Sequence, residues 1–311
     1  MNATAPEIEF QQAEAGVARP GMLQRAVGSW SVRIGGASLA LLVLASLLAP
    51  WLATADPTLL DPINRDLLPG ARATMTLLSG ETVPHIFHMG SDAYGRDIYS
   101  RLLHGGRVSL VVGTAVAVLS LCAGMVLGLF AGYLRRLDLI LMRLMDGLMA
   151  IPGILLAVSL VALWRASLVS VIAALAIPEV PRVVRLVRSL VLSIREEPYV
   201  EAAISIGTLT TPLLFRHVLP NTLAPLIVQA TYVCGSAILG EAILGFLGMG
   251  LPPLVPTWGN MMAEGRLQFN QYPHNVFFPG VFLTITVLAV NLLGDGLRDT
   301  LDPRFSRRGW R

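Results

Sequence analysis

The chain has 311 residues, of which 54% are hydrophobic and 14% are charged, and its formal net charge is +3. Ordinary soluble domains carry about 25% charged residues, so this composition excludes a soluble globular protein and a disordered tail protein. All 23 basic residues are arginines, which excludes a phosphate-binding loop ending in Gly-Lys-Ser/Thr and any lysine Schiff base. If the protein depends on ATP, another chain hydrolyses it.

Neither the basic charge nor the cysteines and histidines indicate a soluble binding site. Membrane topology explains the charge better than a DNA-binding surface does, so we expect no nucleic acid partner. Cys122 and Cys234 lie in apolar runs, which favours small buried hydrophobic residues over a disulfide or a metal pair. His85 and His88 lack a third ligand nearby, so we expect solvated loop histidines and no metal site.

Long apolar stretches predict membrane-spanning helices, because a bilayer requires roughly 20 mostly apolar residues per helix. Three runs reach about this length without any charged residue: residues 34–53, 108–134 and 276–294. These runs predict the first, second and sixth spans.

Two further spans contain charged residues. The third runs from about 138 to 164, and Arg143 and Asp146 lie three residues apart in it, where they can neutralise each other on one helix face. The fifth runs from about 221 to 248 and carries the single charge Glu241.

A fourth span is predicted over residues 166–188, where Pro178, Glu179 and Pro181 interrupt the apolar stretch. This segment is helical and kinked, or it is not a span. We accept this segment as a span. Without it, the regions before and after it would lie on the wrong sides of the membrane for the arginine distribution. The expected fold is therefore an all-α membrane protein with six transmembrane helices.

The arginines indicate the orientation, because cytoplasmic loops carry an excess of them. With both termini cytoplasmic, fifteen arginines lie inside and seven outside, five of the seven in the long loop between the first two spans. We therefore expect a multi-pass protein with both termini cytoplasmic. Its expected segments are a flexible cytoplasmic tail (1–28), the first transmembrane helix with its external loop (29–107), the transmembrane core (108–300) and a cytoplasmic C-terminal tail (301–311).

The segment 193–221, between the fourth and fifth spans, has the pattern of a helix, a break and a second helix. Pro198 suits the first turn of a short helix, and Gly207 can stop that helix in a left-handed conformation. Thr210 or Thr211 then caps a second helix, which Leu219-Pro220 ends before the fifth span.

This segment resembles the cytoplasmic EAA loop of ABC importer permease subunits in three features: Glu201-Ala202-Ala203, Gly207 and Leu219-Pro220. The generic pattern has isoleucine where this chain has His217, and residues 216–221 instead look like the peptide-importer subset. Three other stretches are similar to that subset: Gly90–Asp97, Glu241–Gly250 and Asn291–Pro303.

The resemblance implies a type I ABC importer permease fold with a cytoplasmic coupling helix, in the bacterial inner membrane. It implies a second homologous permease, two ABC ATPase subunits that hold ATP and Mg²⁺, and a binding protein that delivers di- or oligopeptides. No cofactor, metal or catalytic residue is expected on this chain. The residues that the resemblance implies for ATPase coupling are Tyr199, Glu201, Ala202, Ala203, Gly207, Arg216, Leu219 and Pro220.

Residues 90–97 precede the second span on the expected outer side. Asp92 or Ser91 can cap a helix that runs through Ile98 along the outer membrane surface. Direct docking of the binding protein is the alternative, and both can hold. The residues concerned are Gly90, Asp92, Gly95, Arg96 and Asp97.

Polar groups at membrane depth are costly and face a cavity or a partner helix. They are therefore either pathway residues or polar contacts between helices. The candidates are Glu241, Glu179, Arg143, Asp146 and Asn291. Arg182, Arg185 and Arg188 recur near the inner surface, where we expect lipid headgroups or helix-end carbonyls as their partners.

Other readings remain open. The same importer class could carry another solute, such as a nickel chelate or glutathione. An ion-driven secondary transporter typically has inverted repeats, and the sequence shows none, although Pro178 and Pro181 leave a broken helix open. An intramembrane enzyme is disfavoured, because neither His-Glu-x-x-His nor Gly-x-Ser-x-Gly occurs.

Overall fold

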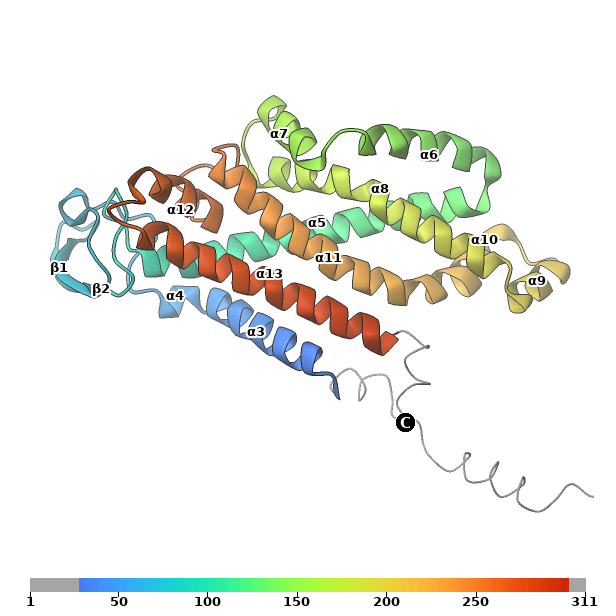
Figure 1. Cartoon of the computed structure of the whole chain (residues 1–311), viewed down its shortest axis with the longest axis horizontal. Coiled ribbons are helices and arrows are strands. Elements are labelled where there is room, and N and C mark those ends of the chain that lie inside the picture. Colours follow the sequence, from blue (N-terminus) through green and yellow to red (C-terminus); the bar gives the residue numbers. More distant parts are fainter. Residues whose placement is uncertain (1–27, 302–311) are drawn as a thin grey trace, which may run out of the picture.

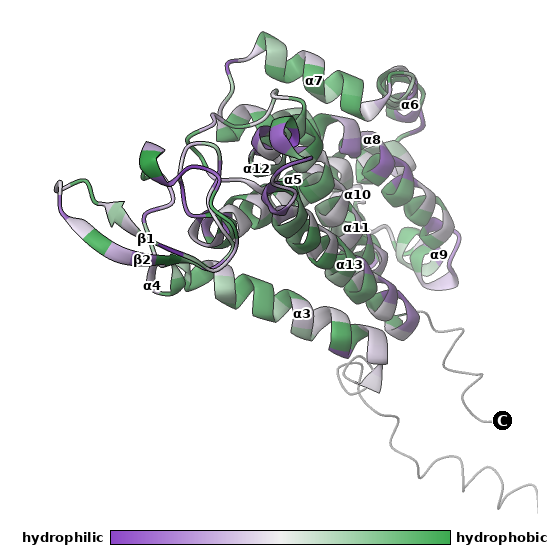
Figure 2. Ribbon diagram, turned by 60° about the vertical axis from the view of Figure 1, so that its left-hand side comes forward, coloured by the Kyte–Doolittle hydropathy of each residue, from purple (hydrophilic) through white to green (hydrophobic). Residues whose placement is uncertain are grey.

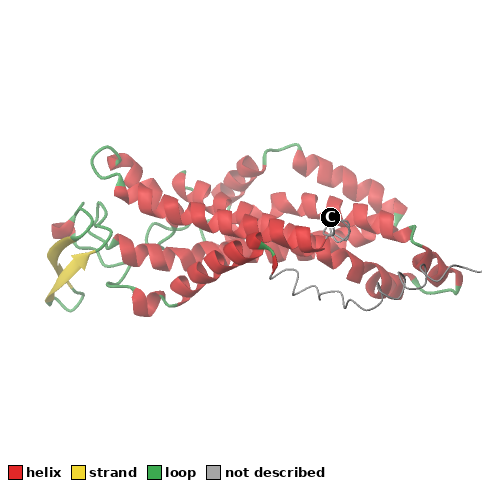
Figure 3. Ribbon diagram, turned by 60° about the horizontal axis from the view of Figure 1, so that its bottom comes forward, coloured by secondary structure: helices red, strands yellow, loops and turns green. Residues whose placement is uncertain are grey.

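The computed structural model describes residues 28–301 and is 73% helical. Figure 1 shows the long helices running beside one another along the longest axis of the molecule. The short helix α9 lies at one end of this bundle and the strands β1 and β2 lie at the other, which Figure 3 shows as the only end with strands in the described part. We call these the α9 end and the hairpin end. The predicted tails, 1–28 and 301–311, lie almost wholly outside the described residues.

The helices in chain order are α3 (Trp30–Leu47), α4 (Ala49–Leu52), α5 (Ile98–Tyr133), α6 (Arg135–Met149), α7 (Gly153–Leu163), α8 (Leu168–Arg195), α9 (Pro198–Ser205), α10 (Thr210–Pro212), α11 (Leu219–Phe246), α12 (Trp258–Gly265) and α13 (His274–Leu301). A π-helical segment, Leu213–Val218, joins α10 to α11, and 3₁₀ turns lie at Pro62–Asn64 and Arg266–Gln268.

Four helices within residues 28–301 are long and apolar enough to cross a membrane: α3, α5, the continuous helix over 210–246, and α13. The bent pair of α6 and α7 makes a fifth when it is counted as one span. Helix α8 has the length of a span, 28 residues, but carries Glu179, Arg182 and Arg185 within it. With α8 included, the helices correspond in order to the six expected spans.

The third expected span is a broken helix. Helix α6 ends at Met149 and α7 begins at Gly153, and the two are bent by 86°. Pro152 lies at the break, where its missing N–H and its ring prevent the helix from continuing through the preceding turn. The expected pairing of Arg143 with Asp146 is wrong, because Asp146 accepts a hydrogen bond from Arg185 of α8 at 2.5 Å.

The fourth helix is longer than the sequence indicates. Helix α8 continues to Arg195, with Pro178 and Pro181 inside it, so residues 193–195 belong to α8 and not to the loop that follows. Its start is fixed by reciprocal bonds in which the side chains of Ser167 and Ser170 each accept the other's backbone N–H.

Helices α5 and α8 approach closely because glycines of α5 face valines of α8. Gly124, Gly128 and Gly132 recur every four residues, so they share one side of α5. A Cβ at Gly128 or at Gly132 would lie 2.6 Å from the Cβ of Val187 or Val191, respectively. Small residues permit such an approach in membrane helices. This contact fixes α8, and hence the chain that leads into α9.

The loop before α5 adds a β-hairpin that the all-α expectation did not include. Strands β1 (Ala71–Thr76) and β2 (Thr82–Phe87) pair antiparallel, with Ala71 opposite Phe87. Met75 and Phe87 are buried with Leu59 in a small apolar core. The sequence does not predict these strands, because their threonines and alanines give no clear apolar alternation.

Candidate functional site

Helix α9 is delimited by a proline at its start and a glycine beyond its end. Pro198 is its first residue. Gly207 has a φ of +82°, so the predicted left-handed stop is confirmed. The Gly207 N–H donates to the Ile204 carbonyl at 2.9 Å, and the Thr208 N–H donates to the Ala203 carbonyl at 3.1 Å. These two bonds form a Schellman motif, which satisfies the last carbonyls of the helix.

One side of α9 is anchored in the chain and the other is exposed. Val200, Ala203 and Leu213 are buried together. In contrast, Ile206 is 84% and Leu209 75% exposed. Exposed apolar side chains that cluster in this way are typical of an interaction surface. We call this set the apolar ledge: Ile204, Ile206, Leu209 and Phe215.

The coupling residues taken from the resemblance gather at the α9 end, but they do not all face outward. Ala203 is buried and supports α9 from inside, and Leu219 is half-buried. Asn221 Nδ2 donates to the Tyr199 hydroxyl at 3.0 Å, which joins α9 to α11. Partial burial and the nearby Glu197 raise the pKa of Tyr199. The exposed members are Tyr199, Glu201, Ala202, Gly207, Arg216 and Pro220.

The second helix of this segment does not end at Leu219-Pro220, so that expectation is wrong. Leu209, not a threonine, occupies the N-cap position. The helix then continues through the π-helical segment into α11. A proline removes one backbone bond and crowds the carbonyl four residues before it. The wider π-helical turn ahead of Pro220 accommodates both effects. The α9 end is thus continuous with the membrane helix α11.

At the hairpin end, four charged side chains join α12 to the start of α5. Arg96 Nε donates to Asp92 Oδ2 at 2.7 Å. Arg101 Nη1, whose residue is 1% exposed, donates to Asp92 Oδ2 at 2.5 Å and to Glu264 Oε2 at 3.1 Å. Arg96 also pairs with Glu264. Burial raises the pKa of Glu264, although Arg101 and Arg96 lower it in part.

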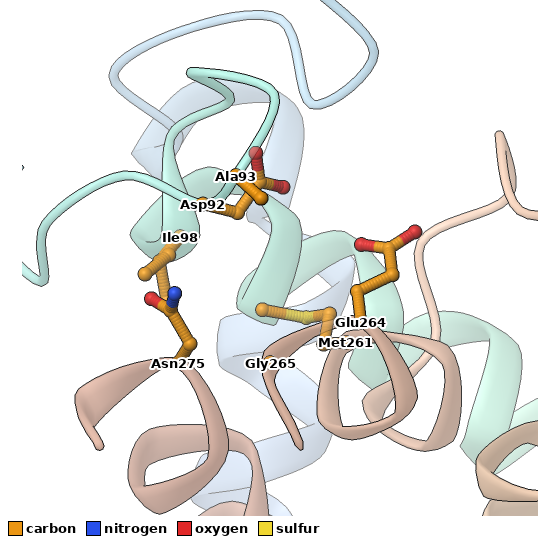
Figure 4. Close-up of a pocket in the computed structure, with 7 residues that line it drawn as sticks. All are labelled: Asp92, Ala93, Ile98, Met261, Glu264, Gly265 and Asn275. Carbon is orange, nitrogen blue, oxygen red and sulfur yellow. The ribbon is translucent and has the colours of Figure 1, made fainter. Parts of the chain in front are cut away.

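Figure 4 shows how this network borders a small cavity. Asp92 reaches it from the loop before α5, Glu264 from α12 and Asn275 from α13. The cavity measures about 10 Å³, the space of roughly one water molecule. The network therefore packs these three segments together and leaves no room for a transported solute.

The loop residues singled out from the sequence, Gly90, Asp92, Gly95, Arg96 and Asp97, are all buried. The cap of the following helix is Asp97, not Asp92 or Ser91, because Asp97 Oδ2 accepts the Ser100 N–H at 2.9 Å. That helix is the first part of α5 and not a separate surface helix. Asp92 accepts the backbone N–H groups of Tyr94 and Arg96 instead.

The expectations for the histidines and cysteines need correction in part. The His85 side chain is 8% exposed, with Nε2 3.8 Å from Asp97 Oδ1, so it is not solvated. His88 is exposed. Among residues 28–301 no group of three or more His, Cys, Asp or Glu side chains could hold a metal ion. Both cysteines are free, and Cys122 is exposed on α5 where a buried residue was expected.

The candidate intramembrane residues lie in different surroundings. Glu241 is fully buried and accepts a hydrogen bond from Ser109 Oγ at 2.9 Å, which joins α11 to α5. Asn291 is half-buried beside Gly235 of α11. Arg143 is exposed and has no ion-pair partner within the described part of the chain. The Glu179 side chain of α8 is 12% exposed and accepts a hydrogen bond from Ser236 Oγ of α11 at 3.0 Å.

Three arginines of α8 pair with carboxylates, where lipid headgroups or helix-end carbonyls were expected. Their partners come from α8 itself and from α6: Arg182 with Glu179, Arg185 with Asp146, and Arg188 with Asp138. Two of these acids lie on a different helix, so spacing along one helix could not reveal them.

A bundle with several helices long and apolar enough to cross a membrane defines the class of polytopic membrane proteins. Comparison with known proteins places the chain within this class. Residues 124–307 match the family described as binding-protein-dependent transport system inner membrane component. The chain belongs to this family and is the permease component of an ABC importer, not an ATPase.

Several curated relatives match nearly the whole chain. A probable peptide ABC transporter permease protein of Sinorhizobium fredii is 48% identical over 89% of this chain and 90% of its own length. A di/tripeptide transport system permease protein of Pseudomonas aeruginosa is 43% identical over 85% of each chain. A glutathione transport system permease protein of Pectobacterium atrosepticum is 43% identical over 70% of this chain and 72% of its own.

Proposed function

We propose that this chain forms half of the translocation pathway of a di- or oligopeptide importer in the bacterial inner membrane. A second homologous permease forms the other half, and two ATPase subunits that bind ATP and Mg²⁺ contact the α9 end. Both termini lie in the cytoplasm, and a binding protein delivers the peptide at the hairpin end. The names of relatives at 41–48% identity support the peptide substrate, and the arginine excess supports the orientation.

One observation carries the proposal: α9 is rigidly anchored while its apolar ledge is exposed. Val200 and Ala203 hold α9 against Leu213, which lies in the helix that continues into α11. Helix α8 leads into α9 from the other side after a two-residue turn. When a partner bound to the apolar ledge moves, α8 and α11 therefore move with it as one packed unit. The ATPase subunits supply that movement.

At the hairpin end, the buried loop residues act by shaping the surface on which the binding protein docks. Asp92, Arg96 and Arg101 hold α12 in place. A groove of about 240 Å³ lies outside them, lined in part by the exposed Tyr94 and Leu267. This groove is the docking surface that the geometry favours, because its lining is mostly apolar and includes Glu264 of the charged network.

The test uses the complex purified through a tag on this chain and reconstituted in liposomes with its binding protein. We expect ATPase chains and a second permease to co-purify, and we expect uptake of alanyl-alanine that requires ATP and the binding protein. If the isolated chain moves peptide down an ion gradient without ATPase chains, it is a secondary transporter and the proposal fails.

The same assay separates the solutes within the importer class. Alanyl-alanine, glutathione and a nickel chelate compete for one binding protein, and the proposal requires the dipeptide to compete most strongly. Because one relative is named a glutathione transport system permease protein, glutathione is the second candidate solute.

A further inference from the structure

The middle of α8 carries a charged stripe on the side away from α5. Glu179, Arg182 and Arg185 recur every three residues, while Val187 and Val191 are buried against α5. Arg182 is 61% exposed. Glu179 and Arg182 are the twelfth and fifteenth of 28 residues, so each lies roughly 16–24 Å from either end of α8 at 1.5 Å per residue. Both are therefore at membrane depth.

Helices α11 and α13 extend this stripe into a polar face. Ser236 Oγ of α11 donates to Glu179 Oε1 at 3.0 Å, and the Tyr232 hydroxyl donates to Asp295 Oδ1 of α13 at 2.5 Å. Figure 1 shows α11 lying between α8 and α13, and Figure 2 shows hydrophilic stretches on α8 within a mostly hydrophobic bundle. We call this set the polar face: Glu179, Arg182, Arg185, Tyr232, Ser236 and Asp295.

Lipid does not cover the polar face, because a charged side chain at the centre of a bilayer costs about 2.5–3.5 kcal/mol even on insertion scales. Other helix surfaces are apolar and therefore suit contact with lipid. Leu41, Leu155 and Leu163 are each more than half exposed on α3 and α7. Water in a solute passage, or a partner helix, therefore covers the polar face.

Arg182 is the one arginine of the stripe whose Nε–Nη2 edge is free of its ion pair. Its side chain is also exposed on the polar face. Its Nη1 donates to both oxygens of Glu179 at 3.1 Å, and its Nε and Nη2 have no partner within residues 28–301. Arg185, in contrast, uses Nη2 on Asp146 at 2.5 Å, so its Nε–Nη2 edge is already occupied in part. The Nε–Nη2 edge of a guanidinium matches a carboxylate in a bidentate pair.

We infer that Arg182 is a carboxylate-binding residue of the passage, and that its open edge receives the C-terminal carboxylate of the peptide in transit. Glu179 and Ser236 are positioning residues, since Glu179 holds the guanidinium through Nη1 and Ser236 Oγ donates to Glu179. The inference rests on the proposed function for its ligand, and on the polar face for its site.

The first test measures uptake by the whole complex in liposomes with alanyl-alanine. Arg182→Gln should lower the uptake rate about tenfold, the loss of one charge-assisted pair. Arg182→Lys should retain part of the rate, because the charge remains but the fork is lost. Arg136→Gln, at an exposed arginine away from the polar face, should match the original chain. Binding-protein-stimulated ATP hydrolysis and recovery of the second permease should stay unchanged in all three.

The second test measures water access directly. In a chain with Cys122 and Cys234 replaced by alanine, Ser236→Cys should react with a charged thiol reagent, and alanyl-alanine should slow the reaction. Leu155→Cys, on the apolar surface, should not react. An unreactive Ser236→Cys chain, or loss of the second permease with Arg182→Gln, would mean that a protein partner covers this face, and the inference would be overturned.

These outcomes are distinct from failure of the proposed function. A reactive Ser236→Cys chain in a complex that imports no peptide would contradict the peptide substrate and leave a water-filled passage in place. Peptide uptake that is unaffected by Arg182→Gln would contradict the inference alone.

Discussion

The Thr208 N–H donates to the carbonyl of Ala203 at 3.1 Å, and Gly207 between them makes this bond possible with a φ of +82°. A side chain at residue 207 would meet nothing within 4 Å. The position therefore requires glycine for backbone conformation and not for space. This relationship sets the angle at which the chain leaves α9 toward the apolar ledge.

Replacing Gly207 with valine should disturb this angle without creating a clash. A β-branched residue in the left-handed region costs roughly 1–2 kcal/mol or more. We expect binding-protein-stimulated ATP hydrolysis per complex to fall severalfold, or the ATPase chains to be lost on purification, with the chain still inserted in the membrane. Gly207→Asn is the control, since asparagine tolerates this conformation and should retain most of the coupling. Normal coupling in the valine variant would contradict the coupled movement of α8, α11 and the apolar ledge.

Replacing Gly128 with valine should separate α5 from α8. A Cβ at Gly128 would lie 2.6 Å from that of Val187, and overpacking costs about 1–3 kcal/mol in a tight core. The detergent-solubilised complex should lose its monodisperse peak at a lower temperature in size-exclusion chromatography. Gly147→Ala is the control, because nothing lies within 4 Å of a Cβ there. An unchanged transition in the Gly128 variant would show that the close α5–α8 contact is absent.

Stability at the hairpin end should depend on pH through Glu264. Burial raises the pKa of Glu264 above its ordinary value of 4.5, so the folded protein holds this proton more tightly than the unfolded chain. That stabilisation is fully present below pH 4.5 and is lost as the pH rises through the raised pKa of the folded state. We therefore compare the temperature of the thermal transition in the original chain with that of Glu264→Gln at each pH. The difference between the original chain and the variant should fall as the pH increases above 4.5.

The control for this pH series is Glu81→Gln, which removes an exposed carboxylate from the hairpin turn. Its transition should follow that of the original chain at every pH. A Glu264→Gln chain that also follows it would show that Glu264 is not titrating in a buried network.

The sequence predicts the parts of this fold that depend on local apolar runs and on single special residues. Runs without charge located three of the spans, and Gly207 marked the end of α9 because only a few residues tolerate a positive φ. The same reasoning placed the helix-break-helix segment 193–221 between the fourth and fifth spans, and its coupling role comes from the resemblance alone.

What the sequence does not reveal depends on contacts between distant segments. Asp146 pairs with Arg185 across two helices, whereas spacing along one helix pointed to Arg143. The buried position of His85 depends on a hairpin that brings it to Asp97. The apolar ledge is not among the residues that the resemblance implies, and Leu209 and Phe215 belong to it through the turn after Gly207 and the π-helical segment.

The most direct test of the central claim is site-directed cross-linking at the apolar ledge. In a chain with Cys122 and Cys234 replaced by alanine, Ile206→Cys is treated in native membranes with a short thiol–amine cross-linker, and Tyr94→Cys at the hairpin end serves as the matched exposed position. The account predicts that Ile206→Cys links to an ATPase subunit and that Tyr94→Cys does not. A link from Tyr94→Cys to the ATPase, with none from Ile206→Cys, would contradict it.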